Sequence, residues 1–190
     1  MTIDAREFRT CLGQFATGVT IVSCRAGEAV RGATVNAFMA VSLDPPLVAV
    51  SLDRRSRICR YLRARPFAVT VLGSQAHDTA LHFAGRPQPE AGIEWVDGPT
   101  APAVAGGIAT FVCRPWATYD GGDHLLYVGQ VQEITHLPND SPLLFFGGTF
   151  RDIGPHMAGI PWLETLDSPM SGVDWRPKHP VLPHLTKEAR

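Results

Sequence analysis

The chain has 190 residues, enough for one domain with a substantial core, and its 45% hydrophobic and 18% charged residues are typical of globular proteins. A net charge of −1 without a long basic run argues against a nucleic-acid-binding protein, and no apolar run reaches the ~20 residues of a membrane-spanning helix. The N-terminus lacks a signal-peptide layout and no Cys-x-x-Cys pair occurs, so we expect a cytoplasmic protein with reduced, buried thiols. The four cysteines are Cys11, Cys24, Cys59 and Cys113.

The first predicted element is a helix that ends near Gly13. Phe8, Leu12 and Phe15 recur at helical spacing, which gives the helix one apolar side. We expect this helix to pack on the core as a lid.

β-Strands dominate the rest of the chain. Segments 19–24 and 30–35 are rich in β-branched residues and flank a loop with Gly27, which predicts an antiparallel hairpin. Because strands do not alternate with long helices, we expect a mainly β fold, an antiparallel β-barrel with short helical lids. Further strands are predicted over 46–52, 67–72, 93–96, 108–113, 124–135 and 143–146.

Two short helices are predicted between these strands, each with a serine as its N-cap. Ser56 would cap a helix that contains Ile58 and Leu62, and Ser74 would cap a helix from about Gln75 to Ala84. A hydroxyl and arginines at a helix N-terminus can bind a phosphate, although a solvated surface loop explains the residues around Ser56 as well.

The chain changes character near residue 154. Six prolines interrupt any periodicity beyond this point, so we expect a folded domain over 1–153 and an extended Pro-rich C-terminal arm over 154–190. Trp162 and Trp175 favour docking of the arm onto its own barrel or a partner subunit, and a disordered tail is the alternative. The prolines are Pro155, Pro161, Pro169, Pro177, Pro180 and Pro183.

No familiar catalytic motif is present. The chain has no Gly-x-Ser-x-Gly elbow, no phosphate-binding Gly-x-x-x-x-Gly-Lys and no dinucleotide Gly-x-Gly-x-x-Gly after a strand. The histidines lack partners at ligand spacing, so we expect no metal site. Asp123 directly precedes His124, where a carboxylate either orients the imidazole or stabilises the turn.

Residues 32–52 form the segment around which we expect the function to be organised. Small residues there would let a flat ligand lie against the backbone, and nearby amide and hydroxyl groups offer uncharged hydrogen bonds. A β-turn-β unit whose polar groups satisfy their own backbone explains the segment too. The small residues are Gly32, Ala33 and Ala37, and the polar ones are Thr34, Asn36 and Ser51.

Several short motifs follow one another in a fixed order between residues 8 and 151. They are F-A-T-G-V-T-I-V (15–22), G-A-T-V-N-A-F (32–38), V-S-L-D-P-P-L-V (41–48), F-A-V-T-V-L (67–72), F-A-G (83–85), G-D-H (122–124), V-G-Q-V (128–131) and S-P-L-L (141–144). In this order and spacing they resemble the short-chain flavin reductases, the reductase components of two-component flavin monooxygenases. The resemblance implies a Greek-key, FMN-binding split β-barrel that forms a homodimer.

The resemblance also implies an activity. It is hydride transfer from NADH or NADPH to FMN or FAD, with the reduced flavin passed to a partner monooxygenase. The protein would orient the reactants without a proton-exchanging side chain. Two alternatives stay open: an enzyme that keeps FMN as a prosthetic group for another redox reaction, and a flavin-binding module without catalysis.

The resemblance further assigns site residues. His124 would lie at the nicotinamide, flanked by Phe150 and Arg151. Ala37 stands where the family usually has Ser, so one hydroxyl near the flavin is missing. The flavin ring and ribityl chain would contact Ala33, Thr34, Val35 and Asn36; the ribityl and phosphate end would contact Ser51, Leu52, Arg54, Ser56 and Arg57; and Phe83, Ala84, Gly85 and Arg86 would complete the pocket across a dimer interface.

Overall fold

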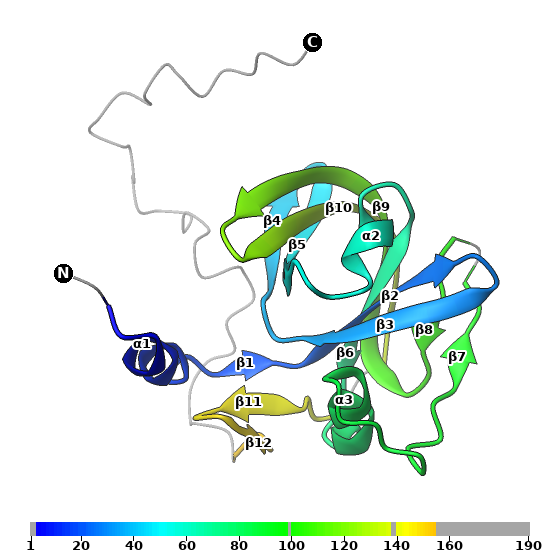
Figure 1. Ribbon diagram of the computed structural model, residues 1–190. Helices are drawn as coiled ribbons and strands as arrows, with labels where there is room; N and C mark the ends of the chain where they lie inside the picture. Colours follow the sequence, from blue (N-terminus) through cyan, green and yellow to red (C-terminus); the bar gives the residue numbers. More distant parts are fainter. Residues whose placement is uncertain (1–2, 99, 138–139, 155–190) are drawn as a thin grey trace, which may run out of the picture. The chain divides into compact units, whose positions relative to one another are not determined.

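The computed structural model of the chain describes residues 3–98, 100–137 and 140–154. Within these residues the fold is mainly β, as expected, with antiparallel sheets and three short helices (Figure 1). No helix in this described part is long and apolar enough to cross a membrane. The arm expected over 154–190 lies outside the described residues except for Gly154, so the division into domain and arm stays a prediction.

A seven-stranded antiparallel sheet forms the centre of the fold. Its strands are β2 (Thr20–Ala26), β3 (Ala29–Val35), β4 (Phe38–Leu43), β5 (Pro46–Asp53), β6 (Phe67–Leu72), β9 (Gly107–Gly121) and β10 (His124–His136). They are ordered β3-β2-β6-β9-β10-β5-β4. The two edge strands, β3 and β4, are consecutive in sequence and separated only by Asn36 and Ala37. The sheet must therefore curl until its two edges approach each other at this connection, as Figure 1 shows.

Smaller elements surround this sheet. The N-terminal segment pairs with the last two strands, so that β1 (Thr17–Gly18), β11 (Leu144–Phe146) and β12 (Thr149–Arg151) form a second antiparallel sheet. The helices are α1 (Ala5–Leu12), α2 (Cys59–Leu62) and α3 (His77–Phe83), and the remaining strands, β7 (Trp95–Val96) and β8 (Ala103–Val104), pair with each other.

The main core lies between the curled sheet and α2. Phe67 and Tyr127 are its largest fully buried side chains, and both pack with Ile58 and Leu62 around α2. The Tyr127 hydroxyl donates a hydrogen bond of 3.1 Å to the Cys59 carbonyl, so the one polar atom that this ring brings into the core is satisfied.

Most strand predictions agree with the structure. The segment 67–72 forms β6, and β10 extends the predicted 124–135 by one residue. β9 is longer than the predicted 108–113 because it continues past Pro115 as far as Gly121. The β9–β10 register shifts between Val128 and Gly129, which faces Pro115, and such an irregularity tolerates a proline within a sheet.

The two serine caps were predicted wrongly. α2 and α3 begin further along the chain, and neither has a side-chain cap. The Ser56 amide donates to the Asp53 carbonyl in a turn that precedes α2, and the Ser74 amide donates to the Ser141 carbonyl. Each serine therefore belongs to a turn before its helix, where its hydroxyl does not reach the orphan amides of the helix.

The lid prediction for the first helix was wrong as well. α1 has an N-cap, because the Asp4 carboxylate accepts two main-chain amides of the first turn. None of its residues is buried, however, and Phe8 and Leu12 are 53% and 57% exposed. Cys11, which was expected to be a buried thiol, is exposed for the same reason, whereas the other three cysteines are buried.

Gly129 provides a test of the core packing. A β-carbon at this position would lie 2.5 Å from the Phe67 Cζ and 2.8 Å from the Cys113 Cβ. Gly129→Ala should lower the free energy of unfolding by about 1–3 kcal/mol because it overpacks the core. Gly18→Ala is the control, since a β-carbon there meets nothing within 4 Å. Urea unfolding of both variants measures the difference, and equal stabilities would contradict the packing argument.

Candidate functional site

A hollow of about 740 Å³ opens beside β3, and we call it the arginine-lined hollow. Four parts of the chain form its wall: β3, the turn before α2, the end of α3 and the loop from α3 to β7. Five of the residues assigned to the flavin lie in that wall, namely Ala33, Ser56, Arg57, Phe83 and Gly85. The other lining residues are Val30, Arg31, Gly32, Ile58, His82, Pro87, Gln88, Pro89, Gly92, Ile93 and Trp95.

The charge of this hollow is positive. Arg31 and Arg57 contribute guanidinium groups, and no Asp or Glu is among the described lining residues. Neither arginine forms an ion pair with another residue of the described part of the chain. Unpaired guanidinium groups beside the Ser56 hydroxyl suit an anion such as a phosphate.

The hollow takes its shape from the contact between α3 and β3. The Thr34 hydroxyl donates a 2.6 Å hydrogen bond to the Ala80 carbonyl and ties the helix to the strand. Gly32 lets the Phe83 ring approach closely, since a β-carbon there would lie 2.9 Å from two ring carbons. Phe83 also contacts Trp95, with ring centroids 5.5 Å apart. Phe83 and Gly85 thus line the same hollow as Ala33 within one chain, and completion of the pocket across a dimer interface stays a prediction.

A second hollow, of about 390 Å³, lies at the connection between β3 and β4, and we call it the apolar hollow. It contains two more of the assigned residues, Asn36 and Ser51, together with Ala37. Thr17 also lines it, and the buried Thr17 Oγ1 has no hydrogen-bond partner among the described residues. The other lining residues are Leu12, Phe15, Phe38, Met39, Ala49, Val50 and Leu126.

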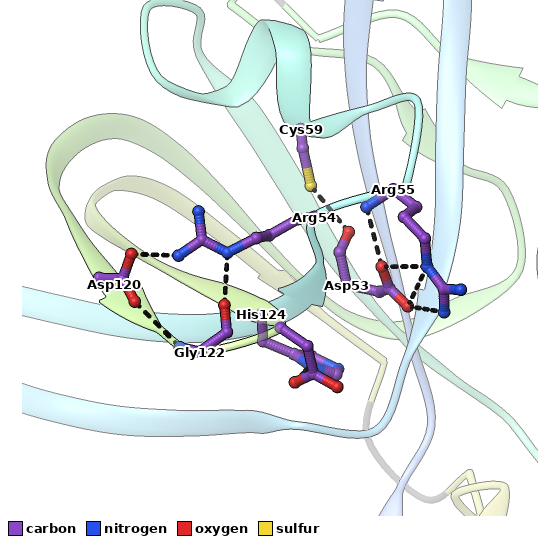
Figure 2. A network of polar contacts seen from close by, with 8 residues as sticks. Asp53, Arg54, Arg55, Cys59, Asp120, Gly122 and His124 are labelled. Carbon is purple, nitrogen blue, oxygen red and sulfur yellow. Dashed lines mark hydrogen bonds and ion pairs between the residues drawn. The ribbon is translucent and has the colours of Figure 1, made fainter.

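His124 begins β10, directly after the turn from β9. Its Nδ1 lies 2.7 Å from Asp123 Oδ1, and this contact holds the pKa of Asp123 below its usual range. Opposite His124 in the sheet register is Asp53, whose carboxylate accepts hydrogen bonds from the Arg55 guanidinium and amide. These bonds hold the pKa of Asp53 far below its ordinary value (Figure 2). The imidazole therefore has carboxylates on two sides, and both are ionised near neutral pH.

Arg54 lies between this turn and the segment that leads to α2. It was assigned to the phosphate end of the flavin, but its guanidinium donates to the Gly122 carbonyl and the Asp120 carboxylate. Figure 2 shows Arg54 and Arg55 extending in opposite directions from the end of β5.

The remaining assigned residues lie outside both hollows. Val35 and Leu52 are buried in the main core, so only their main chain can face a ligand. Ala84 and Arg86 are exposed at the end of α3.

Phe150 and Arg151 belong to β12, in a different sheet from His124. The Phe150 ring packs edge-on against His77, with centroids 5.0 Å apart, and the Arg151 Nε donates to the Thr149 hydroxyl. Within the described chain, their flanking of the nicotinamide stays a prediction.

Sequence reasoning left several residues of the arginine-lined hollow unassigned, among them Arg31, His82 and Trp95. Strand alternation is a signal for Arg31, because residues two apart in a strand face the same side and Ala33 was already assigned. No comparable signal exists for Trp95, since the loop that precedes the short strand β7 brings it to the hollow.

Comparisons with known proteins identify the family of the chain. The family model described as "Flavin reductase like domain" matches residues 12–154. The chain is 36% identical over 170 residues to the reductase subunit of a flavin-dependent monooxygenase from Rhodococcus jostii, with 87% of each chain covered. It is 40% identical over 145 residues to the reductase component of 4-hydroxyphenylacetate 3-monooxygenase from Thermus thermophilus, covering 76% of this chain and 93% of the relative.

A solved structure is similar over most of its length. The NADH:FAD oxidoreductase of Streptomyces globisporus superimposes with a TM-score of 0.75 at 34% identity, covering 85% of this chain and 96% of that one. Sequence and structure thus agree on one assignment, and the chain belongs to the flavin reductase-like domain family.

Proposed function

We propose that the chain is an NADH-dependent flavin reductase that reduces FMN or FAD on a split β-barrel scaffold. The observation that carries the proposal is the arginine-lined hollow, which gathers five residues that the family motifs assign to the flavin. NADH is the proposed donor because the similar Streptomyces enzyme is named an NADH:FAD oxidoreductase. The free thiols suit the reducing cytoplasm, where such an enzyme would work.

The residues of the two hollows fit a flavin. The arginine-lined hollow, at about 740 Å³, is within the ~300–1,000 Å³ range of small-molecule sites. Arg57 and Ser56 would hold the phosphate there, with Arg31 adding positive charge. In the apolar hollow, the largely apolar lining together with the uncharged polar groups of Asn36 and Ser51 suits a ligand that combines apolar surface with hydrogen-bonding atoms.

The protein's part in the reaction is to bind and orient. When bound, the flavin accepts a hydride from the reduced nicotinamide, so the reaction needs neither a nucleophilic side chain nor a metal ion. His124 would contact the nicotinamide. Asp123 fixes the imidazole ring of His124, because its carboxylate accepts a hydrogen bond from Nδ1. The rate advantage comes from holding the two reactants at near-attack distance.

The reduced flavin would serve a partner monooxygenase. The Rhodococcus and Thermus relatives are named as reductase parts of monooxygenases, so we assign this chain the same kind of partner. Retention of FMN as a prosthetic group is the alternative, and the test below separates the two.

The first prediction concerns the activity itself. Purified protein should oxidise NADH, followed by its loss of absorbance, at a rate that rises with added FMN or FAD. A protein that leaves gel filtration with a flavin absorbance band and ignores added flavin would favour the prosthetic-group alternative. Absence of NADH oxidation under both conditions would contradict the proposed function.

The second prediction concerns the phosphate end. Arg57→Gln should weaken FMN binding by about tenfold or more, because a charge-assisted hydrogen bond to phosphate is lost. Arg60→Gln is a matched control, since Arg60 is an exposed arginine of α2 that does not line the hollow. Fluorescence titration measures both dissociation constants, and equal affinities in the two variants would remove Arg57 from the site.

We also propose that the active form is a homodimer built on the apolar side of α1 and β4. Phe15 is 77% exposed and Leu43, on the edge strand β4, is 82% exposed. Phe8, Leu12, Met39 and Val41 are also exposed, which gives a large apolar surface around the apolar hollow. Such a surface marks a binding face, and a second copy of the chain would close the hollow.

The third prediction tests this face. Leu43→Glu should convert the dimer into a monomer, because a charge directly in an apolar interface cannot be solvated. Ile134→Glu is the control, since Ile134 is 60% exposed and lies on β10 beyond the residues that pair with β5. Sedimentation velocity measures the mass of each variant. A Leu43→Glu protein with the mass of the wild type would place the interface elsewhere.

A further inference from the structure

We propose that Arg54 is a positioning residue that holds the β9–β10 turn, and with it the His124 imidazole, against the end of β5. The inference rests on the proposed reductase function and gives Arg54 a different task from the phosphate contact expected from the sequence.

Arg54 contacts the turn at successive points. Its amide donates to the Asp123 carbonyl at 3.0 Å, its Nε donates to the Gly122 carbonyl at 2.5 Å, and its Nη2 bonds to the Asp120 carboxylate. The β5–β10 ladder ends where Asp53 faces His124. Arg54 therefore extends the attachment of the turn one residue beyond the last strand pair.

The turn needs such an attachment. Gly122 has a φ of 78°, and Gly121 precedes it, so the turn contains two residues without a side chain to hold it in place. Asp120 stabilises the turn from inside, since its Oδ1 accepts the Gly122 amide at 3.0 Å. The Gly122 amide and the Arg54 guanidinium together keep the pKa of Asp120 below its usual range, so the carboxylate is charged at neutral pH.

The position of His124 depends on this turn. His124 follows Asp123 directly, and both of its neighbours in the sheet register, Asp53 and Gly121, belong to the ends of their strands. Asp123 orients the ring through Nδ1, and the bond from the Arg54 amide to the Asp123 carbonyl attaches Asp123 to the residue that follows β5. Figure 2 shows the contacts of the Arg54 side chain with Asp120 and Gly122. Release of this side chain would let the turn move relative to β5 and displace the imidazole.

The guanidinium geometry explains why an arginine stands here. One donor reaches a carbonyl and another reaches a carboxylate, and a planar fork can serve both at once. A lysine has a single ammonium group and would keep the charge but lose the two-point contact. A phosphate ligand at this position would, by contrast, tolerate lysine well.

The test combines three variants: Arg54→Gln, Arg54→Lys and Asp120→Asn. Each should raise the KM for NADH and the dissociation constant for NAD⁺ by about tenfold, because a displaced imidazole no longer meets the nicotinamide. The affinity for FMN, measured by titration without turnover, should stay that of the wild type. The Arg54→Gln/Asp120→Asn double variant should be no worse than Arg54→Gln alone, since Arg54→Gln already breaks the contact with Asp120 as well as the one with the Gly122 carbonyl.

A matched ion pair serves as the control. Arg25 and Asp97 form an exposed pair whose side chains are 43% and 75% exposed, close to the 38% and 76% of Arg54 and Asp120. Arg25→Gln and Asp97→Asn should leave both affinities unchanged. Thermal unfolding of every variant identifies any general loss of folding.

Two results would overturn the proposal. Weaker FMN binding in Arg54→Gln, with normal binding in Asp120→Asn and Arg54→Lys, would make Arg54 a phosphate ligand. An unchanged KM for NADH and an unchanged dissociation constant for NAD⁺ in all three variants would exclude a role of Arg54 at the nicotinamide. Failure of the proposed function itself is distinguishable, because the wild-type protein would then show no flavin-dependent NADH oxidation.

Discussion

The two-residue connection between β3 and β4 is the constraint on which the rest of the structure depends. These strands are opposite edges of one seven-stranded sheet, yet only Asn36 and Ala37 separate them. The sheet has to curl to satisfy that short link, and the curl encloses the core around Tyr127. The apolar hollow lies at this link, and the arginine-lined hollow lies along β3, the strand that leads into it. Folding of the core and formation of the site therefore follow from one topological requirement.

The strands could be predicted from the sequence because their signal is local. Residues 67–72 are continuously apolar or β-branched, and burial in the centre of the sheet requires such a segment. The position of α1 could not be predicted in this way. Phe8 and Leu12 show that the helix has an apolar side, but periodicity does not say whether that side meets its own core or a second chain. Within the described part of the chain none of the helix residues is buried, so its apolar side is available to another surface.

The site was predictable only in part, for a similar reason. Family motifs identified Ala33, Ser56 and Phe83, and the structure brings them to one hollow although they lie far apart in the sequence. Arg54 was predicted from its neighbourhood, because a cation near Ser56 suggests an anion site. Its partner Asp120 is 66 residues away, and no local pattern reveals such a pair. The sequence indicated that Arg54 binds an anionic group. Which group it binds depends on the register of β5 and β10, and this register is not visible in the local sequence.

The two ends of the proposed site, the turn at His124 and the arginine-lined hollow, differ in whether their arginines are paired with carboxylates. Near His124, each carboxylate has a positive or hydrogen-bonding partner, since Asp53 binds Arg55 and Asp120 binds Arg54. Those arginines are thus engaged and contribute little free positive potential. Arg57 in the arginine-lined hollow has no such carboxylate within the described chain, so its charge remains available to an anion. The three arginines of this segment therefore differ in their partners. Arg54 and Arg55 bind carboxylates of the chain itself, whereas Arg57 stays available to a ligand. This division would direct a phosphate to the hollow beside β3 and leave the turn before β10 to a neutral ring.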